Sequence, residues 1–203
     1  MCKTYLITGA NGFIGSHLIE SLTKLNLKII CIDKIFSENF NDKFRSYINN
    51  NLIQLEINIL DKESIQNVIN KYNPNTIIHL AGFLDRSSDI SAFATAMDVN
   101  YYGTLNLLNA VIKCEHLENI LLFGTADEYG DIGGTFEEDS KVSPLSPYGI
   151  SKNAACNLAI AYHSIHKLPV NVIRPSIAYG PGQKGNMFIP SLIVSLLNNK
   201  KFK

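Results

Sequence analysis

A tyrosine and a lysine four residues apart, Tyr148 and Lys152, form the pattern in this chain that most directly suggests catalysis. Residues four apart are neighbours on one face of a helix, and the surrounding segment has helical periodicity. An ammonium beside a phenol favours the phenolate, which lowers the pKa of the tyrosine toward neutrality. Such a phenolate can take a proton from an alcohol as hydride leaves the same carbon. The pair therefore predicts oxidation of an alcohol or the reverse reaction, although a surface helix can carry the same two residues by chance.

A glycine-rich segment near the amino terminus, Thr8–Gly15, suggests how the hydride acceptor is held. It lies between an apolar run and a helical pattern, so Gly9 can turn tightly, Gly12 can let a pyrophosphate approach, and Gly15 can let the helix pack on the strand. The amides at the start of that helix would face two phosphates. The glycines are spaced GxxGxxG rather than GxGxxG, so the match to the generic dinucleotide fingerprint is imperfect.

Asp33 ends the next apolar run, 18 residues after Gly15, a spacing similar to that in dinucleotide-binding domains. Its carboxylate can accept both hydroxyls of an adenosine ribose and would repel a 2′-phosphate, which favours NAD(H) over NADP(H). Lys34 either softens that preference or is a solvated surface lysine. The third run ends at Asn58 and Ile59, where an amide side chain and neighbouring backbone can contact the adenine edge.

Thr125 and Asp127 follow the fifth apolar run and form a second candidate for chemistry. The Thr125 hydroxyl can hydrogen-bond the reacting oxygen, and Asp127 can act as a general acid or base. Either residue can instead cap the turn that follows the strand.

Two kinds of segment alternate along the chain and must position these groups. The apolar runs are near-continuous, as in strands buried on both faces of a parallel sheet. They are Tyr5–Thr8, Lys28–Asp33, Leu52–Ile57, Thr76–Ala81, Asn119–Phe123 and Val170–Arg174. The predicted helices are Phe13–Leu25, Lys62–Lys71, Val99–Cys114, Tyr148–His166 and Asn186–Leu197. This alternation predicts a doubly wound α/β fold with a parallel sheet and right-handed crossovers.

The composition excludes several classes of protein. With 203 residues the chain suits one domain, or one domain and a fragment of another. Lys plus Arg equals Asp plus Glu, at 18 each, so bulk charge does not suggest a nucleic acid or membrane partner. No signal peptide or apolar run of about 20 residues is present, which predicts a soluble cytoplasmic protein. The four scattered cysteines predict free thiols rather than disulfides or metal ligands, and no metal is expected.

With these residues in place, the chain resembles the extended short-chain dehydrogenase/reductase family, specifically its NAD-dependent sugar-nucleotide epimerases and dehydratases. The resemblance runs from residue 3 to the end. Beyond the glycine segment and Asp33 it includes Ile77–Gly82, Val99–Thr104, the Thr125 segment, Ser146–Lys152, Arg174-Pro175 and Tyr179–Gly182. It implies a Rossmann fold, NAD as cofactor, a nucleotide-sugar substrate and a homodimer formed through the helices at 99–114 and 148–166.

The resemblance also implies roles for individual residues. Thr125, Tyr148 and Lys152 would be catalytic, with Asp127 added in a dehydratase. The predicted cofactor site comprises Gly9, Asn11, Gly12, Phe13, Ile14, Gly15, Asp33, Lys34, Asn58, Ile59, Leu80, Ala81, Gly82, Asn100, Tyr148, Lys152 and Pro175. The predicted substrate contacts are Thr125, Asn186 and Met187.

The chain departs from the family pattern in three places. Asn58 stands where an aspartate is usual, and Gly82 stands where a second alanine is usual. The family enzymes are also much longer, with a small domain that closes over the sugar nucleotide. We therefore expect residues 1–180 to form the NAD-binding Rossmann domain and residues 181–203 to begin a substrate-binding region whose larger part is absent from this chain.

The reaction remains open between related chemistries. An epimerase returns the hydride to the other face of C4, whereas a 4,6-dehydratase eliminates water from C5 and C6 and needs an additional acid and base there. Asp127 occupies the position of an acidic residue of the dehydratases, but Ala126 stands where some of them carry a second acid. We predict an NAD-dependent epimerase or 4,6-dehydratase. The alternatives are a 4-keto sugar-nucleotide reductase and a non-catalytic NAD-binding module.

Overall fold

A computed structural model describes residues 2–48, 50–85, 89–131, 133 and 135–201. Within these residues the centre of the fold is a six-stranded parallel sheet in the order β3-β2-β1-β4-β5-β6. The strands are β1 (Thr4–Thr8), β2 (Lys28–Asp33), β3 (Leu52–Glu56), β4 (Thr76–His79), β5 (Asn119–Phe123) and β6 (Val170–Ile173). The direction of winding reverses between β1 and β4, where doubly wound sheets bind their ligands. The predicted fold class is confirmed.

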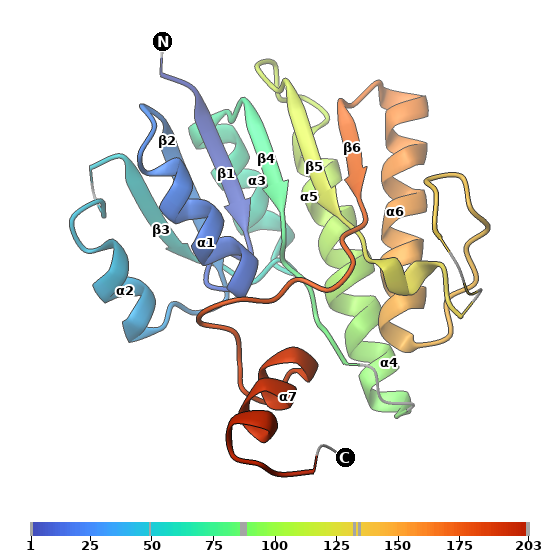
Figure 1. The fold of residues 1–203 in the computed structure, drawn as a ribbon. Coiled ribbons are helices and arrows are strands. Elements are labelled where there is room, and N and C mark those ends of the chain that lie inside the picture. Colours follow the sequence, from blue (N-terminus) through green and yellow to red (C-terminus); the bar gives the residue numbers. More distant parts are fainter. Residues whose placement is uncertain (1, 49, 86–88, 132, 134, 202–203) are drawn as a thin grey trace.

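Helices cover both faces of the sheet (Figure 1). On one face α1 (Phe13–Leu22) and α2 (Glu38–Phe44) enclose a core that contains Ile7 and Ile29. On the other face α3 (Lys62–Tyr72), α5 (Gly103–Val111) and α6 (Pro147–His166) enclose a core that contains Leu6 and Ile30. Since successive residues of a strand point to opposite faces, the near-continuous apolar runs supply both cores.

The helix α2 was not predicted, although it carries a readable signal. Phe36, Phe40 and Phe44 are spaced by four residues and are buried against the sheet. The hydroxyl of Ser37 caps the helix by accepting the Phe40 N–H at 3.3 Å. At seven residues the helix is too short for periodicity alone to separate it from a loop.

The predicted helix Val99–Cys114 begins earlier than expected. The helical segment starts with α4 (Ile90–Ala96) and continues through a π-helix, Met97–Tyr102, into α5, which ends at Val111. Several other predicted elements differ at their ends by one to three residues, as hydrogen-bonding criteria commonly allow. Thus α1 ends at Leu22, β4 ends at His79 and α7 (Phe188–Leu197) begins two residues late.

Two helices that directly follow predicted site residues lie at or beyond the carboxyl ends of the strands. A short 3₁₀ helix, η2 (Ala126–Glu128), follows β5, and α7 lies beyond the strand ends (Figure 1). The loop that leads to α7 is tied to α1 by a 2.9 Å hydrogen bond between His17 Nε2 and the Pro181 carbonyl. In the part of the chain that the structure describes, no helix combines the length and apolar character needed to cross a membrane. All four cysteines are free, as predicted.

Candidate functional site

The glycine segment forms the tight turn between β1 and α1. Gly9 has a φ of +70°, and a Cβ there would lie 2.5 Å from the Ala81 backbone nitrogen. A Cβ on Gly15 would lie 2.5 Å from the Gly9 carbonyl oxygen. The Gly12 N–H closes the turn by donating to the same oxygen at 3.1 Å. The backbone here is packed too closely for side chains. No side-chain hydrogen bond caps α1 at Gly12, so the first N–H groups of the helix can donate to an anion.

Asp33 lies beside this turn at the end of β2. Its carboxylate accepts the Asn11 N–H at 2.9 Å and the Lys34 N–H at 2.8 Å. Burial raises the pKa of Asp33, and these hydrogen bonds oppose the rise. The Asn11 side chain holds the following loop, since it accepts from the Ser37 hydroxyl at 2.9 Å. The side chain of Lys34 is exposed to solvent.

Asn58 and Ile59 follow β3 and differ in exposure. Asn58 is exposed, and its side-chain oxygen accepts the Leu60 N–H at 3.1 Å. The side chain of Ile59 is buried in the core and packs so closely on Gly103 that a Cβ there would lie 2.7 Å from Ile59 Cγ2. Any contact of Ile59 with a ligand at this edge is therefore made by its backbone.

Leu80, Ala81 and Gly82 follow β4, and Gly82 lies next to Lys152. A Cβ on Gly82 would lie 3.8 Å from Lys152 Nζ and 3.1 Å from the Asn100 side-chain oxygen. Lys152 is only 5% exposed, and burial lowers the pKa of its ammonium. Among residues 2–48, 50–85, 89–131, 133 and 135–201, none forms a hydrogen bond or ion pair with that ammonium. An ammonium that forms no hydrogen bond with the protein can donate to acceptor oxygens of a ligand.

Thr125 and Tyr148 come from different elements that meet at one point. The Thr125 oxygen caps η2 by accepting the Asp127 N–H at 3.2 Å, so the capping role considered from the sequence is realised. That bond leaves the hydroxyl proton of Thr125 for another acceptor. A Cβ on Gly149 would lie 2.7 Å from the Asp127 carbonyl oxygen, so the first turn of α6, with Tyr148, abuts η2.

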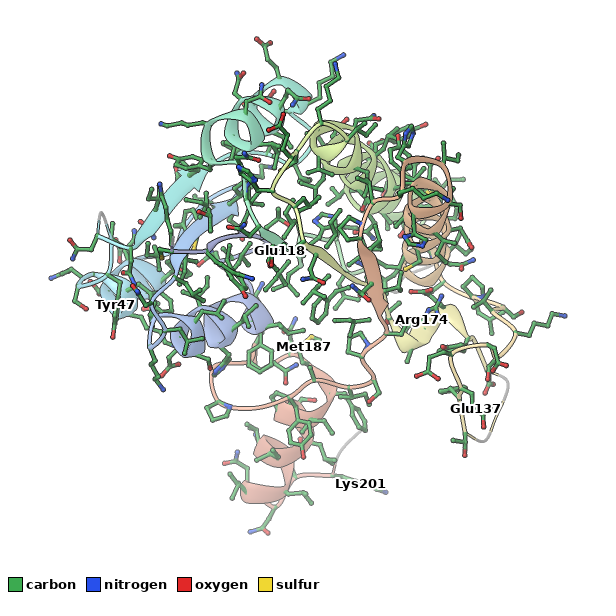
Figure 2. All side chains as sticks on the ribbon, turned by 90° about the horizontal axis from the view of Figure 1, so that it is seen from above. Tyr47, Glu118, Glu137, Arg174, Met187 and Lys201 are labelled. Carbon is green, nitrogen blue, oxygen red and sulfur yellow. The ribbon has the colours of Figure 1, made fainter. Side chains whose placement is uncertain are left out.

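The remaining predicted residues lie around the same edge. The Pro175 carbonyl accepts the Ala126 N–H at 3.0 Å, which places Pro175 beside η2. Asn186 is exposed and Met187 directly precedes α7, in the segment beyond the strand ends. Figure 2 labels Arg174 at the end of β6 and Met187 before α7.

A sequence model of the NAD dependent epimerase/dehydratase family matches residues 5–203, which is nearly the whole chain. The chain belongs to this family. The resemblance inferred from the sequence is thereby confirmed. A dTDP-D-glucose 4,6-dehydratase of Dictyostelium discoideum is 35% identical over 211 residues, which cover 97% of this chain and 48% of that protein. A UDP-glucuronate 4-epimerase of Thermodesulfobacterium geofontis is 29% identical over 206 residues, which cover 98% of this chain and 63% of that protein.

Solved structures of epimerase/dehydratase family members share the fold. A UDP-glucuronic acid 4-epimerase from Bacillus cereus, in complex with UDP-glucuronic acid and NAD, matches with a TM-score of 0.86 at 28% identity. That match covers 97% of this chain and 64% of the other. This chain therefore spans roughly half to two thirds of the length of the epimerase/dehydratase relatives that it matches.

A buried polar chain links several family motifs and was missed in the sequence. The Ala81 N–H donates to the Thr8 hydroxyl at 3.3 Å, which lies 2.6 Å from His79 Nδ1. His79 Nε2 lies 3.0 Å from the Thr104 hydroxyl, which donates to the Asn100 carbonyl at 2.6 Å. Since the Thr104 proton is used in that bond, His79 Nε2 carries a proton and donates it to the Thr104 oxygen. Burial lowers the pKa of His79 to about 3, which keeps the ring neutral and leaves Nδ1 to accept from the Thr8 hydroxyl.

The chain of polar groups continues to the helix that carries Tyr148 and Lys152. The Asn100 side-chain amide donates to the Ser151 hydroxyl at 2.8 Å, and Ser151 donates to the Tyr148 carbonyl at 2.8 Å. Polar residues inside apolar runs, such as Thr8 and His79, were the signal for this network. The sequence could not show that they meet.

Proposed function

We propose that this chain binds NAD(H) and that the enzyme to which it belongs oxidises the C4 hydroxyl of a nucleotide sugar. The support comes from family membership together with the geometry of the site. Relatives named as dTDP-D-glucose 4,6-dehydratase and UDP-glucuronate 4-epimerase bear the substrate class in their names. Two solved relatives, from Bacillus cereus and Bacillus anthracis, were crystallised with NAD.

The single observation that carries the proposal is the Lys152 ammonium. It lies beside Gly82 on the helix of Tyr148, the residue is only 5% exposed, and no described residue forms a hydrogen bond or ion pair with its ammonium. The hydroxyls of a nicotinamide ribose would supply the acceptors that a buried ammonium requires. The turn at Gly9 and the carboxylate of Asp33 fit the pyrophosphate and adenosine ribose of the same molecule.

The proposed mechanism assigns one task to each residue. Bound NAD supplies the hydride acceptor. Lys152 stabilises the phenolate of Tyr148, which removes the proton from the C4 hydroxyl, and Thr125 donates a hydrogen bond to the same oxygen. Asp127 lies two residues from Thr125, where a second acid or base would act on a neighbouring carbon. The reverse step returns the proton from Tyr148.

A 4-keto sugar-nucleotide reductase is a second candidate, favoured by Ala126. Reduction at C4 needs a proton donor at the carbonyl oxygen, whereas elimination across C5 and C6 needs a further acid and base. Ala126 carries no acid, and the Glu128 carboxylate is held by an ion pair with Arg174 at 2.7 Å. Within η2 this leaves Asp127 for elimination chemistry.

The organisation of the chain is proposed on the same basis. Residues 1–180 would form the NAD-binding domain, and residues 181–203 would begin the region that contacts substrate through Asn186 and Met187. A homodimer through the helices around 99–114 and 148–166 is supported by exposed apolar side chains. These include Tyr102, Ile112, Ile150, Ile160 and Ile165.

The test is mass-resolved chromatography after incubation of the purified chain with NAD⁺ and a panel of nucleotide hexoses. A product lighter by one water identifies a dehydratase, and an isomer of unchanged mass identifies an epimerase. Tyr148→Phe should abolish turnover and retain NAD⁺ binding, whereas Tyr162→Phe, on the same helix, should retain both. A 4-keto reductase is tested with NADH and 4-keto nucleotide hexoses, because reduction needs the reduced cofactor. Cofactor binding without turnover, both on nucleotide hexoses with NAD⁺ and on 4-keto derivatives with NADH, would instead support a non-catalytic module.

A further inference from the structure

Glu128 is a fully buried acidic residue directly after Asp127. Its side chain is 0% exposed, and its carboxylate accepts hydrogen bonds from three donors. One carboxylate oxygen accepts the Thr125 N–H at 2.9 Å and the Cys156 thiol at 3.4 Å. The other accepts Arg174 Nε–H at 2.7 Å. Burial raises the pKa of Cys156 to about 12, and Glu128 adds to the rise, so the sulfur keeps the proton that it donates.

This arrangement separates Glu128 from the catalytic acids. A buried carboxylate is tolerated because its charge is paired and its lone pairs are occupied. The space around it is also filled, since a Cβ on Gly124 would collide with the Glu128 carboxylate and lie 2.9 Å from Cys156 Sγ. Glu128 therefore has no open side from which to exchange a proton with a sugar.

Arg174 completes the connection to β6. Its guanidinium lies 5.4 Å from the ring centre of Tyr129, and that ring stacks on Phe136 at 5.0 Å. Figure 2 shows Arg174 at the end of β6, beside the segment that contains η2. The next residue, Pro175, accepts the Ala126 N–H at 3.0 Å. Glu128, at one end of the ion pair, thus holds the Thr125 backbone, and Arg174, at the other end, directly precedes Pro175.

We infer that the Glu128–Arg174 ion pair is a positioning device that sets the distance between Thr125 and Pro175 and thereby orients the nicotinamide end of the cofactor. The inference rests on the proposed binding of NAD(H), because Pro175 is a predicted contact on the nicotinamide side. The ion pair lies at the end of β5, whereas the glycine turn and Asp33 lie across the sheet at β1 and β2. Its loss should affect the nicotinamide end and leave the adenosine end in place.

The test compares the dissociation constants of NAD⁺ and ADP-ribose, which differ by the nicotinamide ring. Glu128→Gln removes the charge and leaves Arg174 unpaired. We expect it to weaken NAD⁺ binding by roughly tenfold and ADP-ribose binding by less than about twofold. Glu118→Gln is the matched control, because Glu118 pairs with Lys3 on the surface before β5. It should change neither constant.

A double variant tests whether the two charges act as a unit. Glu128→Gln with Arg174→Gln removes both charges and should restore part of the NAD⁺ affinity, since no unpaired charge remains. This variant also keeps the inference testable where Glu128→Gln alone fails to fold. Equal weakening of NAD⁺ and ADP-ribose, unchanged NAD⁺ affinity in Glu128→Gln, or additive losses in the double variant would overturn the inference and leave the proposed function standing. Absence of NAD⁺ binding in the unsubstituted chain would overturn both.

Discussion

The side-chain amide of Asn100 donates a hydrogen bond of 2.8 Å to the hydroxyl of Ser151, the residue directly before Lys152. Asn100 lies in the π-helix between α4 and α5. Its side-chain oxygen also accepts the Phe83 N–H at 2.7 Å, and its amide nitrogen donates to the Phe83 carbonyl at 3.0 Å. One amide therefore connects the segment after β4 to the helix of Tyr148. A π-helix inside an α-helix often marks such a functional position.

Ser151→Ala should destabilise the fold by removing one acceptor of this amide. Both residues are at most 1% exposed, so the released N–H stays buried and the expected loss is about 1–3 kcal/mol of unfolding free energy. Urea denaturation measures the loss. Ser164→Ala is the control, because Ser164 lies on the exposed side of α6 and should change stability by less than about 0.5 kcal/mol. Equal losses in the two variants would contradict the role of the Asn100 bond.

Gly15→Ala should damage both stability and cofactor binding. The added Cβ would lie 2.5 Å from the Gly9 carbonyl and 2.7 Å from the Ala10 carbonyl, so the turn must shift. We expect a loss of about 1–3 kcal/mol in unfolding free energy and weaker NAD⁺ binding in calorimetry. Gly185→Ala, where no heavy atom lies within 4 Å of the added Cβ, should leave stability nearly unchanged. A stable Gly15→Ala variant with full NAD⁺ affinity would show that the turn tolerates a side chain.

His79 should make the fold sensitive to acid. Its pKa is lowered to about 3 by burial, whereas an unfolded histidine titrates near 6.5. Between these values the unfolded chain holds a proton that the folded chain lacks, so stability is fully present above about pH 6.5 and falls as the pH falls. His79 alone should cost about 2 kcal/mol between about pH 7 and about pH 5.

Unfolding free energies at the two pH values check this expectation. His79→Gln removes the titrating ring and should abolish that part of the pH dependence. His116→Gln, at an exposed position before β5, is the control and should keep the pH dependence of the unsubstituted chain. The same pH dependence in all three proteins would mean that folding does not lower the pKa of His79.

Asp33→Ser should reduce the discrimination between NAD⁺ and NADP⁺. The carboxylate is half-buried at the end of β2 beside the glycine turn, where it would repel a 2′-phosphate. The ratio of the two dissociation constants should change by about tenfold in favour of NADP⁺. Asp42→Ser removes an exposed carboxylate that pairs with Arg45 and should leave the ratio unchanged. An unchanged ratio in Asp33→Ser would remove this residue from cofactor selection.

Local patterns in the sequence predicted a large part of this protein. The six apolar runs correspond to the six strands, because a parallel sheet with helices on both faces buries both sides of each strand and so favours continuous apolar runs. The glycine turn and the pair Tyr148 and Lys152 were readable because a turn and one helical face depend on spacing alone. Helices α2 and α4 were missed because each has seven residues, too few for a clear period.

What the sequence by itself determined was the fold class, the family and the residue types of the candidate site, since each depends on neighbours along the chain. Only the tertiary structure decided which distant side chains share a buried environment. It placed Glu128 in an ion pair with Arg174, made Asn100 a link to Ser151, and left the Lys152 ammonium without a hydrogen bond or ion pair among the described residues. Burial and pairing set the charge and availability of each group, and both arise only when separate strands and helices pack together.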